Sequence, residues 1–311
     1  MNGDRYIFHN LFGNGLSILQ RGETRKNKKK EVIMIRRVLL IVVLPVLIGL
    51  GQTDAGEEVL DRINVRLTDP LKPAYVELSL VNGGISATGY DGEEVIVEAK
   101  TRTRKLSDDE DRRKKTKGMF RIPVYSTSLE VEEHNNRVEI STESWKRTID
   151  VDLKVPKNTS LNLHCTNNGD IYVENVTGNH EVNNTNGKVT LRNISGSVIA
   201  HALNENVVVT FDAIDPEKPM SFSSLNGDID VTFPMNLKCN IKIKNDMGDV
   251  YSDFEITRIE KPVETFEENG RGRDGRYRIR IERTFYGTIN GGGPEYFFKN
   301  FNGDILIRRA K

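Results

Sequence analysis

The sequence predicts an all-β protein, folded as a β-solenoid in which short strands stack and Asn-Gly pairs form the corners. Three observations lead to this prediction. A turn phrase built on Asn-Gly returns at intervals of about 20 residues, as in stacked repeats. After each turn, β-branched and polar residues alternate with the period of two that marks a strand. Helical periodicity is almost absent. A β-sandwich or a prism of hairpins is the alternative.

Residues 38–50, VLLIVVLPVLIGL, form a strongly apolar run that follows Arg36 and Arg37. The run is shorter than the roughly 20 residues that a spanning helix needs, and it suits a signal peptide. We therefore expect residues 34–55 to be a signal peptide and residues 1–33 to be an over-extended N-terminus. A cytoplasmic tail ahead of an uncleaved anchor is the alternative. We therefore expect the protein to be exported and to contact the membrane only through this leader.

Residues 56–311 are predicted to form a single all-β repeat domain. Its first strands, within 57–100 and 120–155, are expected to begin or cap the coil. Two stretches depart from the pattern: a charged loop at 101–118 and an insertion at 256–300. Residues 105–117 lack an apolar face, which favours a solvated loop over a helix. Residues 264–276 are predicted to be a hairpin tip.

The corners align on six glycines, five of which follow an asparagine. Both residue types tolerate a positive φ, which a tight turn requires. Glu205 stands where a worn copy of the phrase should have glycine, and residues 135–140 resemble a second worn copy. The predicted structural turn residues are Asn82, Gly83, Asn168, Gly169, Asn186, Gly187, Asn226, Gly227, Gly248, Asn302 and Gly303.

One apolar residue follows each corner glycine by two positions. Stacked rungs would bury these residues as one aliphatic ladder, worth roughly 1.5–3 kcal/mol for each side chain. The predicted ladder contains Ile171, Val189, Val207, Ile229 and Val250.

Three aspartates, Asp170, Asp228 and Asp249, directly follow corner glycines. Stacking would bring them toward one edge, where a row of carboxylates could bind Ca²⁺ through its oxygens. Lys188 and Asn206 hold the same position on intervening rungs and interrupt that row. The preferred interpretation is therefore structural, with each side chain bonded to backbone amides of the corner. The three remain weak calcium candidates, and no catalytic residue is predicted.

Composition excludes several other classes of function. Lys plus Arg and Asp plus Glu number 45 each, so no net charge favours nucleic acid. The histidines show no metal-ligand spacing, and no phosphate-binding loop is present, so no cofactor is predicted. Cys165 and Cys239 could form a disulfide or remain free thiols. His164, at an otherwise apolar position, is predicted to be half-buried.

An aromatic concentration lies near the C-terminus. A packed cap on the last rung is favoured over a sugar-stacking or partner-binding patch. It consists of Tyr286, Tyr296, Phe297, Phe298 and Phe301.

The repeated phrases have a known counterpart. NGDIYVENVTG at 168–178 and LRNISGSV at 191–198, after a leader, resemble the bacterial adhesin-like family of the DUF4097 type. The resemblance covers about residues 75–255 and returns at 301–307. It implies a β-strand repeat or β-helix-like fold in exported or envelope proteins.

The sequence thus predicts a non-enzymatic, exported envelope module with a structural or adhesin-like binding role. Envelope glycans or other envelope proteins are the expected partners. One alternative is a carbohydrate-active β-helix enzyme, which would need clustered acids in a groove. Another is an envelope signalling or assembly domain whose edge strands pair with a partner.

Overall fold

The computed structural model describes residues 60–102, 119, 127–142, 147–260, 264–267, 279–282 and 284–311. The predicted signal peptide, the N-terminal stretch before it and most of the charged loop 101–118 lie outside these residues. The chain divides into two units at residue 55, and everything described below belongs to the second unit, Gly56–Lys311. Within the described residues no helix is long and apolar enough to cross a membrane.

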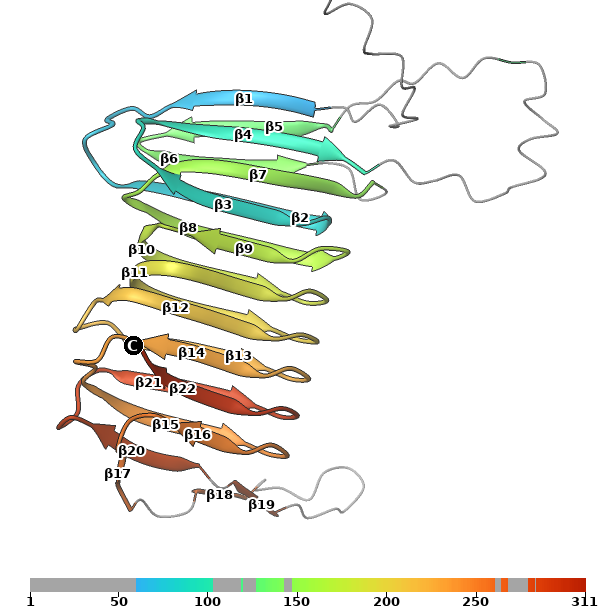
Figure 1. Ribbon diagram of the computed structural model, residues 1–311. Coiled ribbons are helices and arrows are strands. Elements are labelled where there is room, and N and C mark those ends of the chain that lie inside the picture. The colour runs from blue at the N-terminus through green and yellow to red at the C-terminus, as the bar shows by residue number, and fades with distance from the viewer. Residues whose placement is uncertain are drawn as a thin grey trace, which may run out of the picture. The chain divides into compact units, whose positions relative to one another are not determined.

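The described strands form two ladders that stack rung upon rung, as Figure 1 shows. Ladder A contains, in stacking order, β5 (Leu129–His134), β6 (Arg137–Thr142), β2 (Ala74–Asn82), β8 (Thr159–Asn167), β10 (Thr177–Asn184), the second half of β11 (Val189–Ala202), β13 (Met220–Ser224), β21 (Glu295–Asn300), β15 (Cys239–Asn245), β20 (Phe285–Ile289) and β17 (Thr257–Arg258).

Ladder B contains β1 (Leu60–Arg66), β4 (Glu94–Thr101), β7 (Ile149–Pro156), β3 (Ile85–Tyr90), β9 (Ile171–Glu174), the first half of β11, β12 (Val207–Ile214), β14 (Ile229–Phe233), β22 (Ile305–Arg309) and β16 (Val250–Ser252). The strand β11 belongs to both ladders because it bends through a corner between residues 191 and 195. A separate antiparallel pair joins β18 (Glu264–Glu267) to β19 (Ile279–Glu282). This arrangement confirms the predicted β-solenoid.

Each central rung is built in the same way. A strand of ladder A ends at an Asn-Gly corner, and the following strand belongs to ladder B. A second corner, with Asn175 at φ 58° or Asn193 at φ 53°, returns the chain to ladder A. These two asparagines stack, and the Asn193 amide donates to Asn175 Oδ1 over 3.0 Å. The interval of about 20 residues between Asn-Gly pairs therefore corresponds to one turn of the coil.

The rungs do not stack in sequence order. The rung of β21 and β22 lies between that of β13 and β14 and that of β15 and β16. Figure 1 shows this insertion as red strands between orange ones. Likewise β2 and β3 pair directly with β8 and β9, far along the chain. The order in which the rungs stack therefore differs from the order in which they occur in the sequence.

The core lies between the two ladders, where alternate side chains of every rung meet. The predicted aliphatic ladder is confirmed from Ile171 to Ile229, all with 0% exposure. Ile305 continues it, because the inserted rung occupies the place predicted for Val250. Val250 is instead 41% exposed on the last strand of ladder B.

Aromatic rings fill the core beside the inserted rung. Phe211 stacks on Phe233 with ring centroids 5.3 Å apart, and Phe222 stacks on Phe298 at 5.2 Å. Tyr296 stacks on Phe233 at 5.5 Å. These contacts belong to an inner rung, so the predicted cap on the last rung is wrong in its position.

Two sequence expectations about the ends are corrected by the ladders. Residues 135–140 are not a worn rung, because Asn135 and Asn136 form the turn of the hairpin β5–β6. The stretch 256–300 was expected to interrupt the repeat, but it supplies β17, β20 and β21 to ladder A. The hairpin tip expected at 264–276 lies largely outside the described residues, apart from β18.

Candidate functional site

The Asn-Gly corners line up along one edge of the stack and form a hydrogen-bonded asparagine row. Each side-chain amide donates to the asparagine of the preceding rung. The bonds join Asn168 to Asn82 at 3.0 Å, Asn186 to Asn167 at 2.6 Å, Asn204 to Asn186 at 2.7 Å and Asn226 to Asn204 at 2.9 Å. The side chains that predicted a turn therefore also tie neighbouring rungs together.

The corner residue after each glycine forms a second row. Asp170 Oδ1 accepts the backbone N–H of Lys188 at 2.9 Å, and Asn206 Oδ1 accepts that of Asp228 at 2.9 Å. Asp228 Oδ1 likewise accepts the backbone N–H of Asp304, and Asp304 Oδ1 accepts that of Asp249, each at 2.9 Å. The bonds support the predicted structural role, but they link neighbouring rungs and do not close single turns.

The calcium candidates are therefore arranged differently from the prediction. Asp170 stacks beside Lys188, whereas Asp228 and Asp249 lie on either side of Asp304. Within the described part of the chain, no group of three or more His, Cys, Asp or Glu side chains is placed to hold a metal ion. Calcium binding by these aspartates stays a prediction without a supporting cluster.

The corner glycines are required mainly for close stacking. Only Gly83 and Gly303 among the predicted glycines have a positive φ, at 137° and 136°. Gly187 does not have a positive φ, but a Cβ there would lie 2.0 Å from the Gly169 carbonyl oxygen of the preceding rung. The predicted reason, a φ above zero at every corner, is thus wrong for most of them.

A buried polar row beneath the corners was missed by the sequence interpretation. Asn184 Nδ2 donates to the Gly169 carbonyl at 3.0 Å, and its Oδ1 accepts the Gly187 N–H at 3.1 Å. Ser224 and Asn300 hold the equivalent inward positions on later rungs. The available signal was a polar residue three positions before the glycine, in an otherwise apolar register.

We expect Asn184→Ala to lower the free energy of unfolding by about 2 kcal/mol, because two buried backbone groups lose their partner. Asn183→Ala, on the half-buried outer position of the same strand, is the matched control and should cost far less. Urea unfolding followed by circular dichroism measures both. Equal losses for the two variants would contradict the role of the buried amide.

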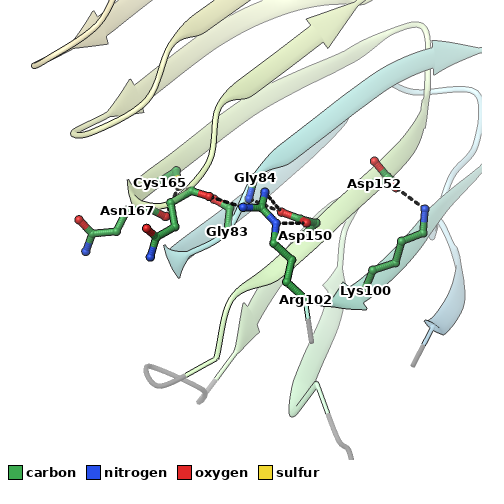
Figure 2. A network of polar contacts seen from close by, with 9 residues as sticks. Gly83, Gly84, Lys100, Arg102, Asp150, Asp152, Cys165 and Asn167 are labelled. Atoms are coloured by element: carbon green, nitrogen blue, oxygen red, sulfur yellow. Dashed lines mark hydrogen bonds and ion pairs between the residues drawn. The ribbon is translucent and has the colours of Figure 1, made fainter. Parts of the chain in front are cut away.

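One corner is fixed by an arginine, as Figure 2 shows. The Arg102 guanidinium donates to both oxygens of Asp150, at 2.5 and 2.6 Å, and to the Asn168 carbonyl at 2.7 Å. Asp150 Oδ1 also accepts the Gly84 N–H at 2.7 Å. The hydrogen bond that the guanidinium donates to Asp150 is the main cause that raises the pKa of Arg102.

This arginine cluster borders a shallow polar depression of about 580 Å³, lined also by Asn167, Asp170 and Asn186. Its polar groups are largely engaged in the rows described above. The cluster therefore ties the end of β4 to β7 and to the corners at Gly84 and Asn168. It offers no free nucleophile or base.

The two cysteines are separate, buried thiols. Cys165 Sγ donates to the Gly83 carbonyl at 2.8 Å beneath the first corner. Burial raises the pKa of Cys165 to about 11 and that of Cys239 to about 12. Of the two possibilities left open by the sequence, the structure shows free thiols.

His164 is exposed, contrary to the predicted half-burial. Leu163 takes the inward position, in register with Leu78. The cause is one extra corner residue, Asn168, which adopts φ 65° and shifts the alignment by one position.

The outer surface of ladder A carries a group that we call the lysine–aromatic patch: Lys242, Tyr286, Phe297 and Lys299. The Lys242 ammonium lies 5.2 Å from the Phe297 ring centroid and 5.8 Å from that of Tyr286. Lys299 lies on the neighbouring row, beside Ser223 and Lys244. The predicted aromatic concentration is thus divided: Tyr296 and Phe298 are buried, while Tyr286 and Phe297 face outward.

The patch is positively charged and borders a histidine. His201 bonds to the Ser223 hydroxyl at 2.8 Å. Burial, and secondarily the charge of Lys299, lower the pKa of His201. Planar rings with flanking ammonium groups form a surface suited to sugars that carry anionic substituents.

Comparison with known proteins now places the chain. The family model "Toastrack DUF4097" matches residues 114–290. The chain belongs to the Toastrack DUF4097 family. This match confirms the resemblance drawn from the repeated phrases, and the ladders show the β-solenoid-like fold of this Toastrack chain.

Solved structures similar to this Toastrack protein include a "putative cell adhesion protein" from Clostridium sporogenes ATCC 15579. It has 10% identity and a TM-score of 0.40, over 82% of this chain and 100% of that chain. A "putative adhesin" from Bacteroides fragilis NCTC 9343 has 12% identity and a TM-score of 0.31, over 82% and 98%. No curated protein matches the chain.

Proposed function

We propose that this Toastrack protein is a non-enzymatic, exported envelope module that binds acidic envelope glycans through the lysine–aromatic patch. The observation that carries the proposal is the geometry of Lys242 between the outward rings of Phe297 and Tyr286. The rings offer flat apolar surfaces to sugar faces, and the lysines attract carboxylate or phosphate groups.

The scaffold suits recognition of a long polymer. The patch spans β21, β15 and β20, whose backbones are held in register by ladder hydrogen bonds and by the aromatic core beneath. A rigid sheet loses little conformational entropy on binding, so a small number of contacts can be enough for measurable affinity. Names of the similar structures, which refer to adhesion, agree with a binding role but do not identify a ligand.

The charge-reversed variant Lys242→Glu/Lys299→Glu tests the proposal. We expect its binding to heparin, used as an acidic polysaccharide probe, to weaken about tenfold or more, because charged hydrogen bonds are lost. Neutral dextran should bind weakly to both proteins. Isolated cell-wall material serves as the native target, and binding is measured by biolayer interferometry and by pull-down.

Lys154→Glu/Lys157→Glu is the matched control, since it also reverses two charges and both lysines are exposed, at the end of β7 and directly after it. An equal loss for the control and the patch variant would show that only net charge matters. Hydrolysis of a polysaccharide by the purified protein would contradict the non-enzymatic part of the proposal and support the rival β-helix enzyme.

A further inference from the structure

The described part of the chain contains six Asn-Gly pairs, which the structure holds in different ways. An asparagine followed by glycine is chemically labile, because the glycine nitrogen can attack the side-chain amide carbon and no Cβ hinders its approach. For the attack, the side chain must rotate and the glycine N–H must lose its proton. A hydrogen bond on either group opposes the reaction. The pairs are Asn82-Gly83, Asn168-Gly169, Asn186-Gly187, Asn226-Gly227, Asn290-Gly291 and Asn302-Gly303.

The asparagine side chains of these pairs differ in their partners. Four of them bond to other asparagines of the row, namely Asn82, Asn168, Asn186 and Asn226. The Asn290 amide donates to the Leu237 carbonyl at 2.7 Å. Asn302 is exposed, and no group among the described residues bonds to its side chain. The electrophilic amide is therefore unengaged at this pair.

The glycine amide of the same pair is also unengaged. At an earlier corner the buried polar row accepts this group, because Asn184 Oδ1 bonds to the Gly187 N–H at 3.1 Å. The next Asn-Gly corner repeats that bond. Asn300 holds the same place, three residues before Gly303, but its Oδ1 accepts the Phe301 N–H at 2.9 Å. Within the described ranges, no acceptor is bonded to the Gly303 N–H.

Exposure alone does not single out Asn302. Asn226 and Asn290 are also exposed, and no heavy atom lies within 4 Å of a Cβ built on Gly291. These two asparagines nevertheless keep their side chains in hydrogen bonds. Among the described pairs, the one at Asn302 alone leaves both reacting groups without a partner.

We propose that Asn302 is a site of spontaneous covalent modification, at which the side-chain amide becomes a carboxylate. The Gly303 nitrogen loses its proton and bonds to Cγ of Asn302. The bond from Cγ to Nδ2 breaks, and ammonia leaves with that proton. The resulting succinimide ring consumes one water. Opening at one carbonyl gives aspartate, and opening at the other gives isoaspartate, in which the main chain runs through the former side chain.

Both products change the corner of the inserted rung. Each adds a negative charge two residues before Asp304, whose N–H already bonds to Asp228 of the neighbouring rung. Isoaspartate also lengthens the main chain where a Cβ on Gly303 would lie 2.6 Å from the Gly227 carbonyl oxygen. Modified protein therefore differs from the native form in charge and in corner geometry. The inference does not depend on glycan binding by the lysine–aromatic patch.

Ageing of the purified full-length protein tests the proposal. The folded protein is incubated at mildly alkaline pH in heavy-oxygen water and then digested in ordinary water. Only a carboxyl group formed before digestion then carries the heavy isotope. Peptide mass spectrometry follows each Asn-Gly pair separately. We expect Asn302 to react at least about tenfold faster than Asn226 and Asn290, and to give both aspartate and isoaspartate peptides.

Two controls connect the result to the folded corner. Asn302→Gln keeps a side-chain amide but would have to form a larger ring, so it should gain no label at this position. In urea that unfolds the protein, Asn226 and Asn290 should react as fast as Asn302, because their hydrogen bonds are lost. Equal rates in the folded protein would overturn the proposal. An advantage of Asn302 that persists in urea would also overturn it, since neighbouring residues in the sequence would then be the cause.

Discussion

Gly83→Ala is expected to destabilise the protein by at least about 4 kcal/mol, a large part of the 5–15 kcal/mol that stabilises a typical domain. A Cβ at this position would lie 1.7 Å from the Ile149 carbonyl oxygen and 2.5 Å from the carbonyl carbon. Gly83 also has φ 137°, a conformation that L-residues rarely adopt. Two separate penalties therefore act at one corner.

The backbone that would clash cannot move aside. On either side of Ile149 the backbone is held, because the Arg102 N–H donates to the Thr148 carbonyl at 2.9 Å and the Val151 N–H donates to the Gly84 carbonyl at 2.9 Å. Relief of the clash would break one of these inter-rung bonds. The affected rung would open at its corner, and the aliphatic ladder would lose contact there.

Gly291→Ala is the matched control. Gly291 has φ 87°, but no heavy atom lies within 4 Å of a Cβ built there. Its cost should be about 1–2 kcal/mol, the conformational penalty alone. Urea unfolding and soluble yield compare the two variants, and complete failure of Gly83→Ala to fold agrees with the expectation. Equal destabilisation of the two would show that stacking distance is unimportant.

The corners illustrate how far the sequence could predict this fold. The Asn-Gly phrase located most of the turns correctly, because turn chemistry is local. It could not reveal that Gly187 is needed for close contact with the preceding rung, since that contact depends on the stack. One additional residue, Asn168, was enough to place His164 on the wrong face, because a shift by one position reverses every side chain of a strand.

The stacking order was equally hidden. Asp228 and Asp304 are the same residue type and each accepts the corner backbone N–H of the neighbouring rung, so corner chemistry does not encode which rung follows which. The inserted rung is favoured by its rings, Tyr296 and Phe298, which complete the aromatic core. The lysine–aromatic patch depends on that insertion and could not be assembled from sequence order.

A second large effect is expected at acidic pH, from His180. The side chain is 3% exposed and points into the core on β10, between the inward Leu161 of β8 and Val198 of β11. Neither imidazole nitrogen has a partner within hydrogen-bond geometry, although the nearby Val176 carbonyl weakly favours the protonated form. Burial lowers the pKa of His180 to about 4.

The sign of the pH effect follows from that shift. The unfolded chain binds a proton near pH 6.5, whereas the folded protein resists protonation until about pH 4. Falling pH in this window therefore favours the unfolded state. The loss of stability should reach about 3 kcal/mol at the lower end and then level off, since each pKa unit corresponds to about 1.4 kcal/mol.

His180→Leu isolates this effect, because it keeps a core-sized side chain and removes the titrating group. Its stability at neutral pH should be unchanged or higher, since an unpartnered buried polar group is removed. Between pH 6.5 and pH 4, its urea midpoint should fall much less than that of the native protein. His164→Gln, at an exposed outer position, should retain the native pH dependence. If His180→Leu lost stability with acid as steeply as the native protein, the titrating group would have to lie elsewhere.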